Sequence, residues 1–468
     1  MKTNFTLLYT VLLCVAIALS CKSKQQASET PDTPITPPNA DTVQTDSQEL
    51  DEEQKKTAEK KLVLARLKML SGVASAKLIE NQNDQFHSMY EIQIEQPTNH
   101  KDSRSEKFNQ KVYLSHKDFQ QPMVMYLNGY TASNNAYTTE AAGILNANQI
   151  HVEHRFFSDS RPEDIPWDLL TIEQAAHDHH RIVEILKHVY SQPWVSTGIS
   201  KGGMVTIFHK RFFPDDVAVA MPYVAPVNLA KHDKRIYEHL NTVGTDECRQ
   251  KVLDFQKALL IDRERSMELF KRYSDKAGYK YPHGYEASFE LSVFEFSFAF
   301  WQWSGDCSII PDENSTTEEK MQFLFYQIDA PSFFNEETLT GILPFFYQGY
   351  YEIGMYGYEV DQFKGLTKVY TEEVDNYNTF IPEEITVEYT PEPLKDIVSW
   401  LDENGNNMIY IYGEYDPWGA TAYHPTEDTN SLFLELGAGN HSTRLKNFPR
   451  NTQSQAMDSL QMWVERVR

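Results

Sequence analysis

Trp194-Val195-Ser196-Thr197-Gly198-Ile199-Ser200-Lys201-Gly202-Gly203 is a short apolar run that passes into a Gly-x-Ser-x-Gly motif. A longer amphipathic run, residues 204–213, follows directly. The order strand, tight turn, helix holds a serine hydroxyl above the edge of a parallel sheet. Glycines are needed in that turn because larger side chains would clash, and the first N–H groups of the new helix have no intrahelical partners. We therefore predict Ser200 as a nucleophile and the Lys201 N–H as a donor to an oxyanion.

Most of the remaining chain alternates between apolar strands and amphipathic helices. Strands are expected at residues 90–94, 112–114, 123–127, 149–153, 217–223, 408–412 and 432–436, and helices at residues 171–190 and 452–467. The stretch 123–127 is almost continuously apolar, as in a strand covered on both faces. This alternation predicts an α/β fold with a mostly parallel sheet that helices cover on both sides.

An aspartate and a histidine each follow one of the last two predicted strands. Asp416 comes after residues 408–412 and His441 after residues 432–436. The chain order serine, acid, histidine is that of the α/β-hydrolases, and the carboxyl ends of parallel strands share one edge of the sheet. A strand-end aspartate or histidine alone is usually a turn residue, but three such residues in this order predict a triad. In it, His441 takes the Ser200 proton, and Asp416 orients the imidazole and stabilises its charged form.

The turn Asn128-Gly129-Tyr130 follows the central strand at residues 123–127. A glycine just past a central strand lets the backbone bend toward the site. We expect this turn to supply the second oxyanion donor, from the N–H of Tyr130. The alternative is a simple turn without a catalytic part.

The first residues have the features of a bacterial secretion signal. A lysine precedes a mostly apolar run over residues 5–19, which is short for a membrane span, and small and apolar residues precede Cys21. That pattern resembles a lipobox, which predicts a signal over residues 1–21 and lipidation of Cys21. A plain signal peptide cleaved nearby and an uncleaved anchor are the alternatives. Residues 22–60, rich in Pro, Thr, Ser, Gln and acidic side chains, are expected to be a disordered tether, so the expected location is the bacterial cell envelope, on its periplasmic side or at the cell surface.

Three ranges make up the expected folded body: a hydrolase core over residues 61–227, an insertion over residues 228–388, and the rest of the core over residues 389–468. The insertion lacks the rhythm of a parallel sheet and is rich in helix-like and aromatic stretches. We therefore expect a helical lid that covers the site. Cys248 and Cys307 are the two cysteines of the body, and in an oxidising compartment we expect them to form a disulfide within the lid.

The chain has 468 residues and a formal net charge of −24. This acidity argues against a nucleic-acid partner, which needs clustered Lys and Arg, and leaves the lipid anchor as the expected membrane contact. No phosphate loop or cofactor motif stands out, so no cofactor is expected. The cluster His177-Asp178-His179-His180 lies in the predicted helix 171–190. We interpret it as a solvated helix surface and not as a metal site, because only His177 and His180 share a face.

The segment Thr197-Gly198-Ile199-Ser200-Lys201-Gly202-Gly203-Met204 resembles the nucleophile segment of the secreted bacterial prolyl tri-/tetrapeptidyl aminopeptidases, and more distantly that of the lysosomal Pro-X carboxypeptidase and dipeptidyl-peptidase family. Glu153-His154-Arg155-Phe156-Phe157 is the other fairly specific part of this resemblance. Weaker matches extend it over nearly the whole body, at residues 96–100, 171–178, 214–216, 225–226, 347–352, 413–418 and 440–441. Asn99 stands where that family tends to have Asp. The resemblance implies a serine exopeptidase that acts on short peptides and cleaves after proline near a free amino terminus.

Such an activity needs a pocket for proline and a group for the substrate ammonium. The candidates for a rigid apolar pocket are aromatic side chains of the lid and one beside the acid, namely Phe298, Phe300, Trp301, Trp303 and Trp418. Most of them are individually explained as well by lid core. A desolvated carboxylate binds an ammonium through a charge-assisted hydrogen bond, and Glu352 and Glu153 are our candidates. A structural role is the alternative for both, for Glu153 through a pair with Arg155.

Two other functions stay open on this sequence. An esterase or lipase on the same fold would cleave acyl esters and would be indifferent to a free amine. A lipoprotein that binds peptide or glycan on an inactive hydrolase scaffold is the other, although an intact Ser200, Asp416 and His441 argue against it. The sequence leaves the oligomeric state open.

Overall fold

The computed structural model describes residues 51–134 and 137–467. The predicted signal, Cys21 and most of the predicted tether therefore lie outside the described residues. The last part of the tether range is helical, because α1 spans Glu52–Met69 and begins with a capping box in which the Asp51 side chain accepts from the Gln54 N–H at 2.7 Å. Within the described ranges no helix is long and apolar enough to cross a membrane.

A nine-stranded sheet lies at the centre of the described chain, in the spatial order β1-β2-β3-β5-β4-β6-β7-β8-β9. Its strands are β1 (Val73–Ile79), β2 (Ser88–Pro97), β3 (Lys107–His116), β4 (Met123–Leu127), β5 (Asn148–Val152), β6 (Trp194–Ile199), β7 (Val219–Tyr223), β8 (Ile409–Gly413) and β9 (Leu432–Leu436). The strands from β5 to β9 along the sheet are all parallel, whereas β1, β2 and β3 pair antiparallel with their neighbours. The carboxyl ends of the parallel strands therefore share one edge.

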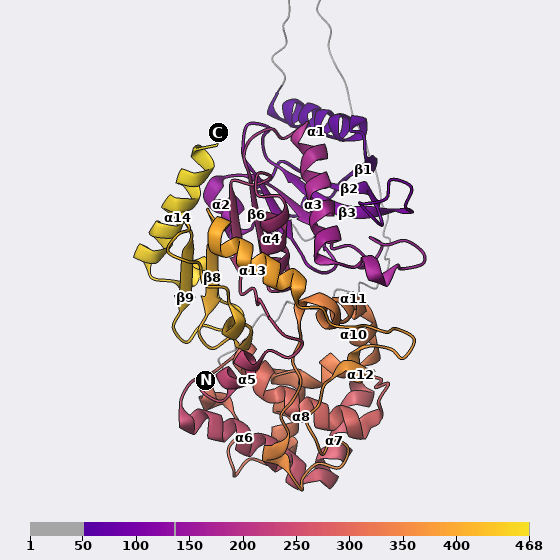
Figure 1. Ribbon diagram of the computed structural model, residues 1–468, viewed down its shortest axis with the longest axis vertical. Helices are drawn as coiled ribbons and strands as arrows, with labels where there is room; N and C mark the ends of the chain where they lie inside the picture. The colour runs from indigo at the N-terminus through magenta and orange to yellow at the C-terminus, as the bar shows by residue number, and fades with distance from the viewer. Residues whose placement is uncertain (1–50, 135–136, 468) are drawn as a thin grey trace, which may run out of the picture. The chain divides into compact units, whose positions relative to one another are not determined.

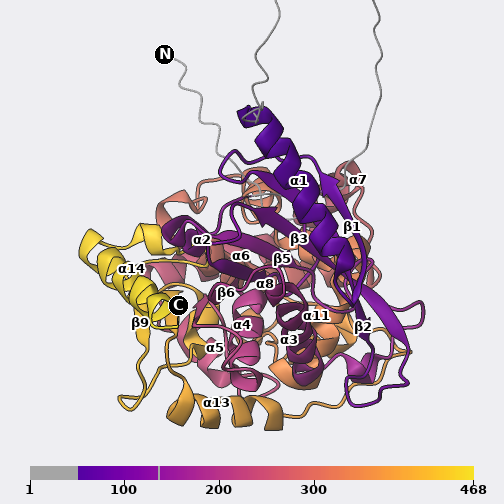
Figure 2. The ribbon, with the colours of Figure 1, turned by 90° about the horizontal axis from the view of Figure 1, so that it is seen from above.

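Helices cover both faces of this sheet (Figure 1). They are α2 (Glu140–Leu145), α3 (Ile172–Lys187), α4 (Lys201–Phe212), α13 (Glu392–Asn404) and α14 (Arg450–Glu465). Successive side chains of a strand point to opposite faces, and β8 shows the consequence. Tyr410 lies in the same buried cluster as Leu394 of α13, whereas its neighbour Ile409 lies in the cluster that contains Leu460 of α14. Helix α1 packs beside β1 through buried Val63 (Figure 2).

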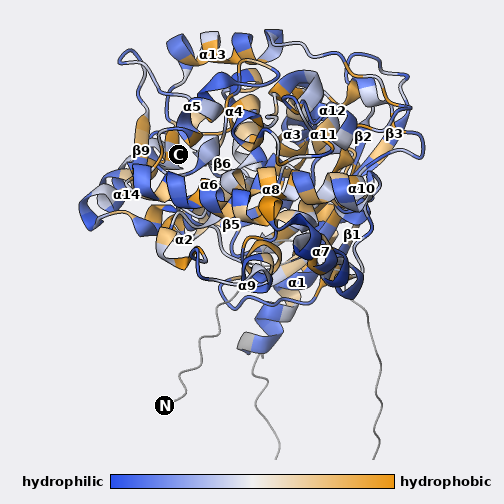
Figure 3. Cartoon of the chain, turned by 90° about the horizontal axis from the view of Figure 1, so that it is seen from below, coloured by the Kyte–Doolittle hydropathy of each residue, from blue (hydrophilic) through white to orange (hydrophobic). Residues whose placement is uncertain are grey.

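The chain between β7 and α13 is largely helical and gathers at the carboxyl edge of the sheet, below it in Figure 1. Its helices are α5 (Lys234–Leu240), α6 (Asp246–Ile261), α7 (Arg263–Ala277), α8 (Gly284–Trp303), α9 (Thr317–Gln322), α10 (Glu336–Gly341), α11 (Leu343–Gln348) and α12 (Tyr377–Phe380). Helix α8 is the centre of this lid: it is hydrophobic along most of its length (Figure 3) and buried on nearly all sides. A disulfide joins Cys248 of α6 to Cys307, with Cα atoms 5.6 Å apart.

The observed arrangement confirms the predicted fold class, an α/β-hydrolase with a mostly parallel sheet covered on both faces and a helical lid insertion. The strand that sequence patterning missed is β1. Its side chains are mostly exposed and only Ala76 is buried, so the strand lacks the alternation that marks a half-buried strand.

Candidate active site

The turn between β6 and α4 has the strained geometry predicted for it. Ser200 has φ 57° and ψ −124°, a conformation that few residues other than glycine adopt. A Cβ on Gly198 would lie 2.2 Å from the Gly202 oxygen, and one on Gly202 would lie 2.2 Å from the Leu127 oxygen. Both contacts are far inside van der Waals distance, so the close packing of the turn against β4 requires glycine at each position.

Asp416 and His441 lie together beyond the ends of β8 and β9. The Nδ1 of His441 is 2.6 Å from Oδ2 of Asp416, and the other aspartate oxygen accepts from the Trp418 N–H at 3.2 Å. Asp416 is fully buried and His441 is 3% exposed. A buried carboxylate that accepts from Nδ1 fixes the imidazole tautomer and leaves Nε2 free to exchange a proton.

The lid holds the histidine loop in place. The His441 N–H donates to the Gln302 carbonyl at 2.9 Å, and the Asn440 side chain donates to the Trp303 carbonyl at 3.1 Å. The Trp303 ring also meets the His441 ring edge-on, with centroids 5.2 Å apart. The end of α8 therefore positions the histidine, and the lid takes part in the construction of the site.

The Ser200 backbone is tied to the neighbouring strand, since its N–H donates to the Tyr223 carbonyl at 2.9 Å. Within the described chain the Ser200 hydroxyl makes no hydrogen bond. In free enzymes the bond between nucleophile and base is often long and tightens when substrate binds. The assignment of Ser200 as the partner of His441 rests on the strained turn and on the shared carboxyl edge of β6, β8 and β9.

The turn at Gly129 packs directly against the start of α4. Gly129 has φ +70°, and a Cβ there would lie 2.7 Å from the Gly202 nitrogen. The Tyr130 carbonyl accepts from the His154 N–H at 3.0 Å. Among the described residues neither the Tyr130 N–H nor the Lys201 N–H donates to a protein acceptor. Two unpaired donors thus lie on neighbouring segments, one directly after Ser200 and one on the turn that packs against the start of α4, and an oxyanion site needs such donors.

The two predicted ammonium ligands are in different environments. Both oxygens of buried Glu153 accept hydrogen bonds from the protein, Oε2 from the Ala132 N–H at 3.0 Å and Oε1 from the Ser160 hydroxyl at 2.7 Å. Glu153 therefore ties the loop after β5 to the loop after β4, and Arg155 is not its partner. Oε2 of Glu352 accepts from the Ile172 N–H at the start of α3, at 2.6 Å. Burial raises the pKa of Glu352 to about 7.

The aromatic candidates divide between the site and the lid core. Phe298, Phe300 and Trp301 are at most 2% exposed and belong to the lid core. Trp303 is 42% exposed beside His441. Trp418 packs edge-on against Phe298, with centroids 5.2 Å apart, and so joins the acid loop to the lid. Of these side chains, Trp303 is thus the one open to solvent at the histidine.

The interpretation of residues 177–180 as a solvated surface is wrong. Asp178 is fully buried and receives two hydrogen bonds from buried Arg155, Nε to Oδ2 at 2.7 Å and Nη2 to Oδ1 at 3.0 Å. The Nε2 of His100 lies 2.7 Å from Oδ1. Burial alone would raise the pKa of Asp178, but Arg155 and His100 outweigh it and hold that pKa low. The prediction considered only which of the four residues share a face of the helix. It did not consider that the segment after β2, which carries His100, covers the side of α3 that carries Asp178.

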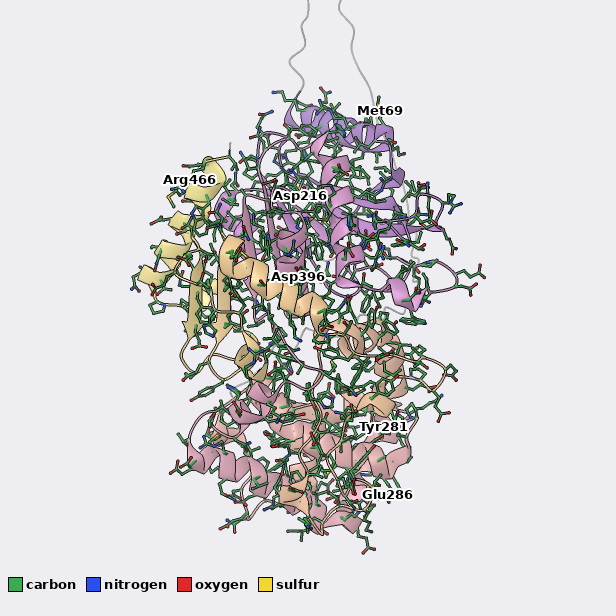
Figure 4. All side chains as sticks on the ribbon, viewed as in Figure 1. Met69, Asp216, Tyr281, Glu286, Asp396 and Arg466 are labelled. Carbon is green, nitrogen blue, oxygen red and sulfur yellow. A yellow bond between two sulfur atoms is a disulfide. The ribbon has the colours of Figure 1, made fainter. Side chains whose placement is uncertain are left out.

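His180, in the same cluster, lies 2.9 Å through Nδ1 from Oδ2 of Asp216, and Nε2 of His209 lies 3.0 Å from the same oxygen (Figure 4 labels Asp216). Both histidines therefore converge on one carboxylate oxygen. Within the described ranges no group of three or more His, Cys, Asp or Glu side chains is arranged to hold a metal ion.

One buried acid of the lid was not predicted at all. Glu295 of α8 accepts from the Tyr356 hydroxyl at 2.9 Å and from the Tyr358 hydroxyl at 2.6 Å. Burial raises the pKa of Glu295 to about 7, although the two hydroxyls lower it in part. A glutamate in the middle of an aromatic run was the signal in the sequence. The two tyrosines also line a lid cavity of about 490 Å³, whose lining includes none of Ser200, Asp416 and His441.

Comparison with known proteins gives one family and one curated relative. The family model described as PS-10 peptidase S37 matches residues 58–465. The chain is 28% identical over 406 residues to the prolyl tri/tetrapeptidyl aminopeptidase of Streptomyces mobaraensis, and the match covers 84% of this chain and 83% of that protein.

Among solved structures, the proline iminopeptidase of Mycobacterium smegmatis matches with a TM-score of 0.41 and 12% identity, over 80% of this chain and 100% of that one. The 2-hydroxy-6-oxo-6-phenylhexa-2,4-dienoate hydrolase of a Rhodococcus species matches with a TM-score of 0.37 and 12% identity, over 83% and 100%. Neither of these two likenesses bears on substrate.

Proposed function

The chain belongs to the PS-10 peptidase S37 family, and from this premise we propose that it is a serine exopeptidase of the aminopeptidase type, which cleaves after proline and releases short peptides from free amino termini. The observation that carries the proposal is the buried pair of Asp416 and His441 at the sheet edge that also carries the strained Ser200 turn. The proline preference is proposed because the Streptomyces mobaraensis relative is named a prolyl tri/tetrapeptidyl aminopeptidase.

In the proposed reaction, the Ser200 oxygen attacks the carbonyl carbon of the substrate proline while Nε2 of His441 takes the hydroxyl proton. The carbonyl oxygen becomes an oxyanion and accepts from the N–H groups of Lys201 and Tyr130. His441 then gives the proton to the leaving amine, the C–N bond breaks, and an acyl-enzyme remains. Water attacks that ester with His441 again as the base, which releases the peptide acid and restores Ser200. Asp416 stabilises the imidazolium in both halves.

Glu352 is the carboxylate that we propose for the substrate ammonium. One of its oxygens accepts from the Ile172 N–H, which leaves acceptor capacity on the carboxylate, whereas both oxygens of Glu153 accept bonds from the protein. Through this bond Glu352, which belongs to the lid, contacts the start of α3, and α3 follows β5 and therefore begins at the carboxyl edge of the sheet. A charge-assisted hydrogen bond from the substrate ammonium to Glu352 would hold the amino terminus of the peptide at a fixed distance from Ser200. That distance would determine which peptide bond reaches the serine.

A panel of chromogenic anilides tests the activity. Ala-Ala-Pro anilide with a free amino terminus should be cleaved, and its acetylated form should not. Ala-Ala-Ala anilide with a free amino terminus is the matched control for proline and should react far more slowly. Equal rates on the free and acetylated peptides would remove ammonium recognition, and cleavage of acyl esters without cleavage of any peptide would instead favour an esterase.

Attachment to the cell envelope through Cys21 is a separate proposal, which rests on the sequence before the described residues. Radiolabelled palmitate should enter the full-length chain in bacterial cells and should be absent from Cys21→Ser, which should move from the membrane to the soluble fraction. Equal labelling of the two forms contradicts lipidation at Cys21.

A further inference from the structure

The side chain of Lys201 is turned into the protein, although the residue directly follows the proposed nucleophile. Lys201 is 2% exposed, and its Nζ donates to the Gly129 carbonyl at 2.6 Å. The same Nζ lies 4.9 Å from the ring centroid of Phe157 and 5.5 Å from that of Tyr130. Burial of a lysine is costly, and in this structure no carboxylate pairs with it. A lysine with a solvated side chain could equally well occupy the first position of α4. The burial of the Lys201 side chain therefore requires an explanation.

The bond to Gly129 fixes the peptide unit that carries the Tyr130 N–H. A trans peptide is planar, and its C=O and N–H point in opposite directions. A donor that holds the Gly129 oxygen therefore also sets the direction of the Tyr130 N–H. We propose that the Lys201 side chain is a positioning residue that locks the Gly129–Tyr130 peptide with its N–H toward the oxyanion. This inference rests on the proposed function of Ser200. It adds a role for the Lys201 side chain, since the proposed reaction uses only the Lys201 backbone N–H.

The peptide needs such a lock because Gly129 is conformationally permissive. Its φ of +70° is accessible to glycine along with several other conformations, so a flip of this peptide meets no side-chain barrier at Gly129. The Tyr130 carbonyl is held from the other side by the His154 N–H at 3.0 Å, but that bond restrains the next peptide unit. Of the contacts made by this turn, the Lys201 bond is the one that holds the Gly129 oxygen.

The lock does not depend on the charge of the amine. Burial lowers the pKa of Lys201 well below its usual value, and the titratable neighbours that face it, His154 and His179, are buried with lowered pKa values of their own. The Tyr130 ring also faces Nζ, and burial raises the pKa of its hydroxyl. A neutral amine still carries N–H donors, so the Gly129 bond persists in either protonation state.

Lys201→Met tests the proposal, because methionine fills similar space and cannot donate. The kcat on the best anilide of the panel should fall about 100-fold, the loss typical of one missing oxyanion donor, with KM changed less than about threefold. Affinity for a peptide boronic acid, which forms a tetrahedral adduct with the serine, should fall by a similar factor. Lys201→Arg, which keeps N–H donors, should recover part of the kcat.

Lys210→Met is the matched control. Lys210 lies on the same helix, is 6% exposed, and also donates to backbone carbonyls, those of Pro214 at 2.7 Å and Val217 at 3.0 Å. Loss of a buried lysine there should lower the melting temperature and leave kcat, KM and boronate affinity within about threefold of the unmodified enzyme, since any effect runs through general stability.

Three results decide the outcome. If Lys201→Met keeps the wild-type kcat and boronate affinity, or loses activity through KM alone, the positioning role is wrong. If that variant does not fold, Lys201→Leu, which also cannot donate a hydrogen bond, should show the same fall in kcat, and a wild-type kcat contradicts the proposal. If Ser200→Ala retains activity on the same anilide, the proposed function itself fails, whatever the lysine variants show.

Discussion

Nδ1 of His441 lies 2.6 Å from Oδ2 of Asp416 in a region closed to solvent, although the two residues follow different strands. The loops that carry them are tied together, since the Tyr415 N–H donates to the Gly439 carbonyl at 2.7 Å. The lid adds a third support through the Gln302 carbonyl, which accepts from the His441 N–H. A histidine held so firmly on its Nδ1 side has one ring nitrogen left for proton exchange, and that nitrogen is Nε2.

Asp416→Asn should inactivate the enzyme without unfolding it. The asparagine NH₂ group would favour the tautomer in which Nε2 carries the proton and cannot take one from Ser200. We expect kcat to fall by about 10⁴, as this change does in Ser-His-Asp peptidases. Asp402→Asn is the control, because an amide oxygen there still accepts from the Tyr423 hydroxyl. More than a tenth of the wild-type kcat in Asp416→Asn, with Asp402→Asn also active, would argue against the triad.

Glu352→Gln should remove the preference for a free amino terminus. A hydrogen bond to a charged group contributes about 1.5–3 kcal/mol, so kcat/KM on the free Ala-Ala-Pro anilide should fall about 10- to 100-fold, with the acetylated form unaffected. Because burial raises the pKa of Glu352 to about 7, the wild-type preference for the free peptide should fall as the pH drops below 7. The variant should show no such trend. Glu184→Gln, on α3 with a side chain that is 64% exposed, is the control, and a preserved preference in Glu352→Gln contradicts the assignment.

Asp178→Ala should destabilise the protein by about 3–5 kcal/mol, because it leaves the buried Arg155 guanidinium without its carboxylate. Asp396→Ala breaks a similar pair with Arg211 on the outer surface of α13 (Figure 4), where the aspartate side chain is 53% exposed. That control should cost less than about 1 kcal/mol. Urea unfolding curves measure the free energy of unfolding of both variants. Equal decreases in the two would contradict a larger contribution of the buried pair to stability.

Glu295→Gln should change how stability depends on pH. Burial raises the pKa of Glu295 from 4.5 to about 7, so between these values the folded state holds a proton that the unfolded state has lost, and stability falls as the pH rises. The difference is worth about 3 kcal/mol above pH 7. Gln lacks this cost and can keep bonds to the Tyr356 and Tyr358 hydroxyls. The free energy of unfolding of Glu295→Gln, relative to that of the wild type, should therefore rise from pH 5 to 7 and stay constant above pH 7. Exposed Glu264→Gln should follow the wild type at every pH. A difference between Glu295→Gln and the wild type that does not change with pH contradicts this prediction.

The sheet was predictable because its strands are apolar and because turn residues such as glycine follow several of them. The strands predicted at residues 123–127 and 432–436 coincide with β4 and β9. The strained turn at Ser200 was predictable for a similar reason, since few sequences other than Gly-x-Ser-x-Gly fit between a strand and a helix at that spacing.

Long-range polar contacts other than the one between Asp416 and His441 were not predictable in the same way. Nothing in the local sequence tells that Asp178 meets Arg155 and His100, because that network depends on how α3 lies against the end of β2. The Lys201 side chain gives a second example. Its burial follows from the position of the Gly129 turn, which lies 72 residues earlier in the chain.

Reaction with a fluorophosphonate probe, followed by peptide mapping, tests the central claim most directly. The probe needs an activated serine hydroxyl and works on the folded, full chain without knowledge of the peptide substrate. We expect one adduct per chain, located on Ser200, lost in Ser200→Ala and formed far more slowly in His441→Ala. A folded protein that forms no adduct at Ser200, or one whose Ser200→Ala variant still cleaves the free Ala-Ala-Pro anilide, would contradict the account.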